Sequence, residues 1–556
     1  MNSSAHIEKD LREQIRQIVI SSTGISPETV SLEIPKVRGN GDLSSSVALQ
    51  LAAPCKKAPL QIAQTLVESL RSAIKGNSLS ESVAQVEVKP PGFINFVLSD
   101  GFYHRVLEEV LKSGPDYGRS SLRTGKKALI EFVSANPTGP LSVAHGRQAA
   151  VGDALANLLD YAGYAVSREY YLNDEGTQID LLGASVLARA QEAAGRPSSF
   201  PENGYKGRYI YDLGKIFSSR IDWEKLGAQA QDEARKFGAG ELAKVIEGEL
   251  AQFGIRFDRW FAQSSLSEKN YLKESLELLK KAGFLYEREG AWWLQSTAFG
   301  DDKDRVVIRS DGRLTYIAAD IAYHRTKFER HFDLLVNLWG PDHHGYIARL
   351  KAAVQALGFP SEALHIRIVQ LCTLKRGAEI IPMSTREGQF ITLTEVMEEV
   401  GKDAARFFFL LRKTDAHLEF DLELAKQHSL ENPVYYIQYA HARIARILEN
   451  WTQQQEAAKS QTPDYSRLSS SEEKELLRLM REFPGCIEAS AKSLEPFGLV
   501  SFLQTVAEAF HRFYDRQRVI TDDLPLSRAR IDLIRAVQTI LATGLRILGV
   551  SAPEKM

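Results

Sequence analysis

The chain has 556 residues, too many for a single hydrophobic core, so we expect three or four domains. Its formal net charge is −2 and its three cysteines, Cys55, Cys372 and Cys486, lie far apart, which argues against a global positive field, a disulfide framework and a zinc finger. No run of about 18 apolar residues occurs, so we predict no membrane segment and a cytoplasmic location.

Residues 1–112 are predicted to form a small α+β domain. Helical patterns lie near residues 7–20 and 59–74, and strand-like segments follow at 83–88 and 90–98. Residues 113–127 are polar and contain glycine, which is typical of a connection between domains.

A βαβ unit follows this connection. Residues 128–133 form an apolar run broken only by Glu131, a Gly/Pro loop comes next, and apolar residues at helical spacing over 151–162 precede a second strand at 164–171. The first crevice of such a unit binds anions, because helix N–H groups converge there. The pattern places His145, Gly146 and Arg147 at that crevice, although an ordinary βαβ turn with a capping histidine fits it equally well.

The next part of the chain is predicted to interrupt the sheet. A helix is expected over 178–194, a loop over 195–207 and further helices up to Ala282, which makes 195–300 an insertion. The sheet should then resume with strands at 305–309, 314–317 and 333–340, and another strand is expected over 366–374.

Polar residues cluster around these later strands. Tyr316 and Asp320 are four apart at a predicted strand-to-helix transition, where both can face one ligand, or Asp320 can simply balance the helix dipole. Residues 340–345, Gly-Pro-Asp-His-His-Gly, favour a nucleotide-contacting loop over a metal site, because no further ligand set accompanies them. The loop 381–393 offers Ser384, Thr385 and Arg386 as a phosphate clamp, or is a plain connector.

From about Asp403 the chain is predicted to be entirely helical, with helices near 434–451, 471–480, 499–514 and 526–548. One of these helices is crowded with aromatic, amide and basic side chains. Such surfaces stack unpaired bases, although tyrosines at helical spacing are more commonly core residues.

Six segments, in order, resemble the class I arginyl-tRNA synthetases over nearly the full length: 91–96, 131–140, 171–179, 316–323, 339–345 and 431–443. The resemblance implies a multidomain protein. An N-terminal α+β domain that recognises the tRNA elbow would span 1–112, and a Rossmann-like α/β catalytic domain with insertions would span 120–400. A C-terminal all-α anticodon-binding bundle would span 401–556, with the family's Asp-Ala-Leu-Arg pattern reading Asp403-Ala-Ala-Arg406.

The implied activity is arginine–tRNA ligation. Arginine is activated with ATP, carrying nucleotide-bound Mg²⁺, to arginyl-adenylate, and is then transferred to the 3′ end of tRNA-Arg; the family implies a monomer and no structural metal. The residues that the resemblance assigns fall into five groups. The catalytic group is His145, Ser142 and Arg386. The ATP-binding group is Pro137, Thr138, Gly139, Leu141, Ser142, Ala144, His145, Gly340, Asp342, His343, Met383 and Ser384. The arginine-binding group is Glu131, Ser134, Asn136, His145, Tyr316 and Asp320. The signature motif is Ala135, Asn136, Pro137, Thr138, Gly139, Pro140, Leu141, Ser142, Val143, Ala144 and His145. The tRNA-binding group is Asn432, Tyr435, Tyr436, Gln438, Tyr439, His441 and Arg443.

Two motifs depart from the family pattern. The usual His-Val-Gly-His reads Ser142-Val-Ala-His145, and the usual Lys-Met-Ser-Lys reads Pro382-Met-Ser-Thr385. Losing one donor to a transition state typically lowers a rate by about 10²–10³. These departures motivate an alternative, a catalytically silent paralogue that binds tRNA as a regulatory or scaffold protein, whereas the retained carboxylates favour an active ligase.

Overall fold

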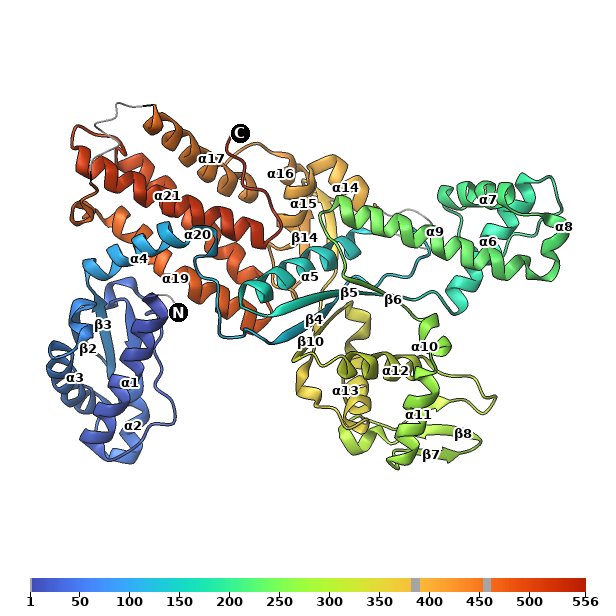
Figure 1. Ribbon diagram of the computed structural model, residues 1–556, viewed down its shortest axis with the longest axis horizontal. Helices are drawn as coiled ribbons and strands as arrows, with labels where there is room; N and C mark the ends of the chain where they lie inside the picture. The colour runs from blue at the N-terminus through green and yellow to red at the C-terminus, as the bar shows by residue number, and fades with distance from the viewer. Residues whose placement is uncertain (1–2, 382–390, 454–461) are drawn as a thin grey trace.

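The computed structural model describes residues 3–381, 391–453 and 462–556, and Figure 1 shows how their helices and strands are arranged. The N-terminal part packs helices against an antiparallel sheet of order β1-β3-β2, as predicted. Its elements are α1 (Ser3–Thr23), β1 (Leu43–Ser45), α2 (Val47–Cys55), α3 (Pro59–Lys75), β2 (Val83–Lys89), β3 (Phe93–Leu98) and α4 (Asp100–Ser113). The turn between β2 and β3 contains a cis bond at Pro90-Pro91.

The central part is a five-stranded, wholly parallel sheet of order β11-β10-β4-β5-β6. Its strands are β4 (Lys127–Glu131), β5 (Ala165–Leu172), β6 (Arg259–Ala262), β10 (Leu334–Trp339) and β11 (Leu364–Ile368). The chain leaves β4 toward β5 on one side and later returns to β10 on the other. The strand order therefore reverses between β4 and β10, and ligands bind at the carboxyl ends of strands beside such a reversal.

Helix α5 (Val143–Tyr161) crosses from β4 to β5 and begins eight residues before the stripe that predicted it. Small residues let it lie close to the sheet: a Cβ at Gly152 would come within 2.2 Å of the Phe132 ring. At Gly146, a Cβ would meet Leu393 at 2.8 Å. The helix is therefore buried almost all round, which fixes the loop that precedes it.

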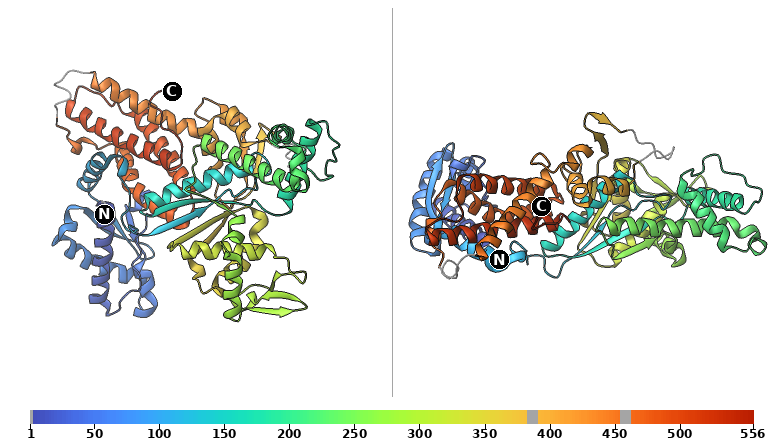
Figure 2. Two further views of the ribbon diagram at one scale, coloured as in Figure 1. Left: turned by 45° about the vertical axis from the view of Figure 1, so that its right-hand side comes forward. Right: turned by 90° about the horizontal axis from the view of Figure 1, so that it is seen from above.

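The insertion differs from its prediction. Four helices, α6 (Thr177–Ala193), α7 (Arg208–Arg220), α8 (Trp223–Leu226) and α9 (Ala230–Gln252), project from the body, and α6, α7 and α9 share a small core of their own (Figure 2). The helical run predicted up to Ala282 was wrong at residues 259–262, because β6 there forms the edge of the central sheet. After β6 come α10 (Ser264–Glu268) and α11 (Tyr271–Lys281).

Two strands predicted for the central sheet lie elsewhere. Residues 305–308 are β9, which belongs to a separate antiparallel sheet with β7 (Leu285–Arg288) and β8 (Ala291–Leu294). Residues 314–317 form no strand, because α12 (Tyr316–Glu329) already begins at Tyr316. Helix α13 (Ile347–Ala356) follows β10 and packs beside α12.

The predicted single strand 366–374 is two strands in different sheets. Its first half is β11, and its second half is β12 (Cys372–Arg376), which pairs with β13 (Glu379–Ile380) and, in parallel, with β14 (Leu418–Asp421). The strand β14 also shows that the all-helical prediction from Asp403 was wrong. This sheet has strands on both sides of residue 401, where the C-terminal domain was predicted to begin. Helices α14 (Leu393–Val400), α15 (Lys402–Phe409) and α16 (Leu422–Lys426) lie around it.

The C-terminal bundle forms as predicted from α17 (Pro433–Thr452), α19 (Ser471–Ser493), α20 (Phe497–Arg516) and α21 (Leu524–Ile547). Helix α4 of the N-terminal part packs against α19 and α21, so the two ends of the chain lie side by side (Figure 1). Within the described ranges, no helix is long and apolar enough to cross a bilayer.

Candidate active site

The loop after β4 is bent sharply where the strand order reverses. Val133 and Ser134 both have positive φ, 67° and 41°, a conformation that non-glycine residues rarely adopt and that recurs at ligand sites. The bend directs the Ser134 hydroxyl to Glu131, to which it donates at 3.0 Å, and the same oxygen accepts from the Tyr171 backbone N–H at 3.1 Å. The strain is therefore held by contacts from β5.

The predicted signature loop is held from outside its own sequence. Tyr209 of α7 donates to the Thr138 carbonyl at 2.7 Å and lies against Gly139. The Leu141 N–H donates to Glu249 of α9 at 2.9 Å, and the other oxygen of Glu249 accepts from Thr394 at 3.1 Å. The insertion and α14 thus clamp the loop between them.

His145 occupies the first turn of α5 and is oriented by Ser142. The Ser142 backbone N–H donates to His145 Nδ1 at 3.2 Å, and the Ser142 hydroxyl lies 3.1 Å from the same nitrogen. Burial lowers the pKa of His145 to about 4, so the ring is neutral near pH 7. Because Nδ1 accepts, the single ring proton lies on Nε2, which is then the donor of the ring. Ser142 therefore fixes the imidazole.

Arg147, predicted to lie at the same anion site, points the other way. Its side chain is fully buried and donates to the carbonyls of Gln370, Leu371 and Lys413 at 2.7, 3.2 and 3.0 Å. It joins α5 to the segments after β11 and α15. Its placement at a phosphate was wrong, since these three carbonyls hold its guanidinium inside the protein.

Two carboxylates come together beside this loop. Glu131 ends β4 and is 5% exposed, while Asp320 lies one turn into α12 and accepts from the Tyr346 hydroxyl at 2.6 Å. Burial raises the pKa of Asp320 to about 6; the Tyr346 hydrogen bond opposes this, and the charge of Glu131 adds to it. Burial and the charges of Asp320 and Glu131 raise the pKa of the Tyr171 hydroxyl. Two carboxylates placed in this way favour a cationic ligand.

Other predicted residues surround these two. Asn136 donates to Gln178 of α6 at 2.6 Å, and Tyr316 is 75% exposed at the start of α12. Asp342 and His343 lie exposed in the short 3-10 helix Pro341–Tyr346 that follows β10, 3.3 Å from each other. Pro382, Met383, Ser384, Thr385 and Arg386 lie outside the described residues. The segment after them is tied to the signature loop, because Leu393 N–H donates to the Leu141 carbonyl at 2.8 Å.

Sequence reasoning missed five side chains that hold the site. Lys327 pairs with Glu131, Tyr346 with Asp320, Gln178 with Asn136, and Tyr209 and Glu249 hold the loop. Lys327 alone left a usable signal, since it lies seven residues after Asp320 and therefore on the same helix face. The other four come from distant segments. Among the described residues, no group of three or more His, Cys, Asp or Glu is placed to hold a metal ion.

The predicted tRNA-binding helix α17 divides into two sets. Asn432, Gln438 and His441 are buried and bond internally, to Ala425, Ser551 and Pro553 respectively. A second set is partly exposed: Tyr435 stacks on Tyr439 at 5.8 Å, Tyr436 and Tyr439 contact His511, and Arg443 lies over Tyr439 and Tyr514. Only this second set presents aromatic faces.

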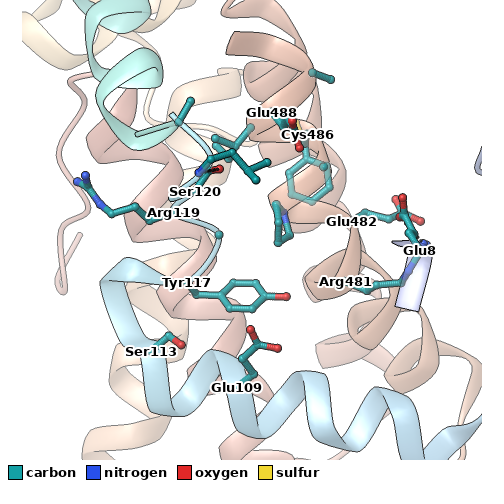
Figure 3. Close-up of a pocket in the computed structure, with 18 of the residues that line it drawn as sticks. Glu8, Glu109, Ser113, Tyr117, Arg119, Ser120, Arg481, Glu482, Cys486 and Glu488 are labelled. Carbon is teal, nitrogen blue, oxygen red and sulfur yellow. Dashed lines mark hydrogen bonds and ion pairs between the residues drawn. The ribbon is translucent and has the colours of Figure 1, made fainter. Parts of the chain in front are cut away.

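A cavity of about 620 Å³ lies away from the site, between the N-terminal part, residues 113–122 and α19. Figure 3 shows Tyr117 extending across it, with Arg481 and Glu8 on the far wall. Arg481 pairs with Glu8 at 3.0 Å, and the Tyr117 hydroxyl donates to the Met480 carbonyl at 3.0 Å. These contacts join the two ends of the chain.

The catalytic part is that of a class I aminoacyl-tRNA synthetase: residues 106–432, which contain the parallel sheet, the strained loop after β4 and the neutral His145, match the family model described as tRNA synthetases class I (R), catalytic domain. Residues 5–98 match the arginyl-tRNA synthetase N-terminal domain, and residues 437–556 match the DALR anticodon binding domain. The chain belongs to the arginyl-tRNA synthetase family.

Individual relatives agree with this assignment. The chain is 45% identical to an arginine–tRNA ligase of Syntrophotalea carbinolica over 96% of both chains. It is 43% identical to an arginine–tRNA ligase of Listeria welshimeri over 100% of both. The fold is similar to that of Thermus thermophilus arginyl-tRNA synthetase, with a TM-score of 0.77, 22% identity and coverage of 99% of this chain and 100% of that one.

Proposed function

We infer that this chain is an arginine–tRNA ligase. Support for this function comes from the place where the strand order reverses: His145 lies in the first turn of α5, and Glu131 at the end of β4 lies near Asp320. A guanidinium is planar, always charged and paired best by carboxylates. Arginine activation needs such a pair of carboxylates beside an ATP crevice.

The chemistry requires no covalent protein intermediate. In the first step, a carboxylate oxygen of arginine bonds to the α-phosphorus of ATP as the bond to pyrophosphate breaks. In the second, a ribose hydroxyl of tRNA bonds to the carbonyl carbon and AMP leaves. Both steps depend on positioning and on donors directed at negative charge. We propose that His145 Nε2–H is such a donor and that Asp320, Glu131 and Asn136 hold the arginine.

Finer assignments are part of the same proposal. Mg²⁺ would enter with ATP and be bound mainly by its phosphates. The aromatic set on α17, which is Tyr435, Tyr436, Tyr439 and Arg443, would stack on unpaired tRNA bases. We further propose that the protein acts as a monomer in the cytoplasm.

Arginine-dependent ATP–pyrophosphate exchange, measured with tRNA-Arg present, tests the function. We expect exchange with arginine to exceed exchange with lysine or canavanine. Asp320→Asn is the matched negative control, because it keeps the shape of the side chain and removes its charge. Absence of exchange in a folded sample would contradict the ligase and support the tRNA-binding paralogue, while faster exchange with another amino acid would change the substrate.

A further inference from the structure

A fully buried ammonium lies directly behind Glu131. Lys327 of α12 is 0% exposed, and its Nζ donates both to the Glu131 carboxylate and, at 2.9 Å, to the side-chain oxygen of Asn337 on β10. The same nitrogen lies 4.3 Å from the centre of the Tyr323 ring. Lysine is almost never fully buried unless it is paired with an opposite charge, and here Glu131 supplies that charge.

The contacts continue from Asn337 to the backbone of Asp320. The amide nitrogen of Asn337 lies 2.8 Å from His324 Nε2, and His324 Nδ1 lies 2.8 Å from the Asp320 carbonyl. Burial lowers the pKa of His324 well below its usual range, so the ring carries one proton. That proton must lie on Nδ1, because a carbonyl only accepts, and Nε2 then accepts from Asn337. Every polar group along the path is satisfied.

One connected network therefore joins the Glu131 carboxylate to the backbone of the helix turn that carries Asp320. It starts at Glu131 on β4, passes through Lys327 and Asn337, and ends at the turn of α12 that carries Asp320. Movement of the Glu131 carboxylate would break its bond to Lys327, and movement of the α12 turn that carries Asp320 would break the bond to His324.

The network also sets the charge of the pocket. The Glu131 and Asp320 carboxylates both lie near Lys327, and its ammonium cancels the charge of one of them, which leaves one negative charge for one guanidinium. Glu131 still has acceptor capacity, because Lys327 and Ser134 each occupy one site on its two oxygens. Without Lys327, Glu131 would be a buried carboxylate with no cation beside it.

We propose that Lys327 is a positioning residue for arginine recognition. It orients Glu131 and, supported by Asn337 and His324, it reduces the net charge of the arginine site to the single negative charge that one guanidinium neutralises. This inference rests on the proposed function, since it assigns Glu131 and Asp320 to the guanidinium. It concerns substrate binding and predicts no role for Lys327 in ATP binding or in the chemical steps.

The test is the Lys327→Met variant, which keeps the length of the side chain and removes its charge. In arginine-dependent exchange with tRNA-Arg, we expect the KM for arginine to rise about tenfold or more, with kcat and the KM for ATP within about twofold of the wild type. Arg325→Met is the matched control, because Arg325 lies on the same helix but pairs with Glu274 and Glu329 on its outer side. It should leave the KM for arginine unchanged.

The double variant Lys327→Met/Glu131→Gln separates positioning from stability. Replacing both charges should restore the thermal midpoint that the single variant loses, yet the KM for arginine should stay raised. A wild-type KM in folded Lys327→Met, or recovery of both properties in the double variant, would overturn the inference. If Lys327→Met does not fold, Asn337→Ser, which keeps Lys327 and removes its support, should raise the KM for arginine about threefold or more, and an unchanged KM would overturn the inference. Wild-type exchange with arginine tests the proposed function separately.

Discussion

Arginine affinity should fall on acidification, because Asp320 titrates close to neutrality. Burial raises the pKa of this carboxyl to about 6; the charge of Glu131 raises it further, whereas the Tyr346 hydrogen bond and the fields of His343 and Lys327 lower it. The guanidinium of arginine keeps its charge throughout this range. Its affinity therefore follows the ionised fraction of Asp320.

The size of the effect follows from that value. Asp320 is about 90% ionised at pH 7 and about 10% at pH 5 when its pKa is about 6, so the Kd for arginine should rise about tenfold between these pH values. The effect on folding has the opposite sign. A carboxyl whose pKa is raised in the folded state contributes stability below its unfolded value, near 4, and that contribution is lost as pH rises through about 6. Acid thus weakens binding without weakening this part of the fold.

Isothermal titration calorimetry with arginine at pH 5, 6 and 7 measures the change. Asp320→Asn should bind arginine weakly at every pH, with no slope. His343→Gln, which removes an imidazole whose field reaches Asp320, should keep the slope, and His145 remains neutral across the range because its pKa is about 4. A constant wild-type Kd from pH 7 to 5, or the same slope in Asp320→Asn, would refute the assignment.

Two further predictions concern α5. His145→Ala should lower the rate of arginyl-adenylate formation by about 10²–10³ with little change in ATP binding, and a single-turnover rate within about threefold of wild type would refute a donor role. Gly152→Ala should lower the free energy of unfolding in urea by about 1–3 kcal/mol or more, because the new Cβ would lie 2.2 Å from the Phe132 ring. Gly248→Ala, in open space on α9, should be neutral or stabilising by up to about 1 kcal/mol, and equal losses at both positions would contradict the packing argument.

Elements with strong periodicity were predictable from the sequence. The β4–α5–β5 unit and the four long C-terminal helices follow from apolar spacing alone. The predictions failed at short strands whose partners are distant in the sequence. Strand β6 has four residues and lies within a helical region. Strand β14 pairs with β12, where Leu418 lies opposite Cys372, 46 residues earlier in the chain. The strand predicted over 314–317 is absent for another reason, since Thr315 is the N-cap of α12 and the helix begins at the next residue. Local patterns do not carry such tertiary pairings.

The candidate site was predictable as a set of residue types and not as a network. The resemblance assigned Glu131, Asp320 and His145, and the structure places them around one strand reversal. It could not indicate that Lys327 neutralises Glu131 from 196 residues away, or that Ser142 orients His145. The resemblance assigned Asn432 to tRNA, and the structure shows its side-chain oxygen capping α17 and its amide nitrogen donating to the Ala425 carbonyl. Contacts that satisfy buried polar groups decide these roles.

The contact between the two ends of the chain affects how the protein folds during its synthesis on the ribosome. Helix α4 and Glu8 are synthesised first, but α19, with Arg481, which receives them, emerges more than 350 residues later, a delay of tens of seconds at about 5–20 residues per second. During that interval the apolar face of α4 that later meets α19 has no partner from its own chain. A chaperone that shields nascent helices would act on this face, and truncated chains ending before Ser471 should expose it.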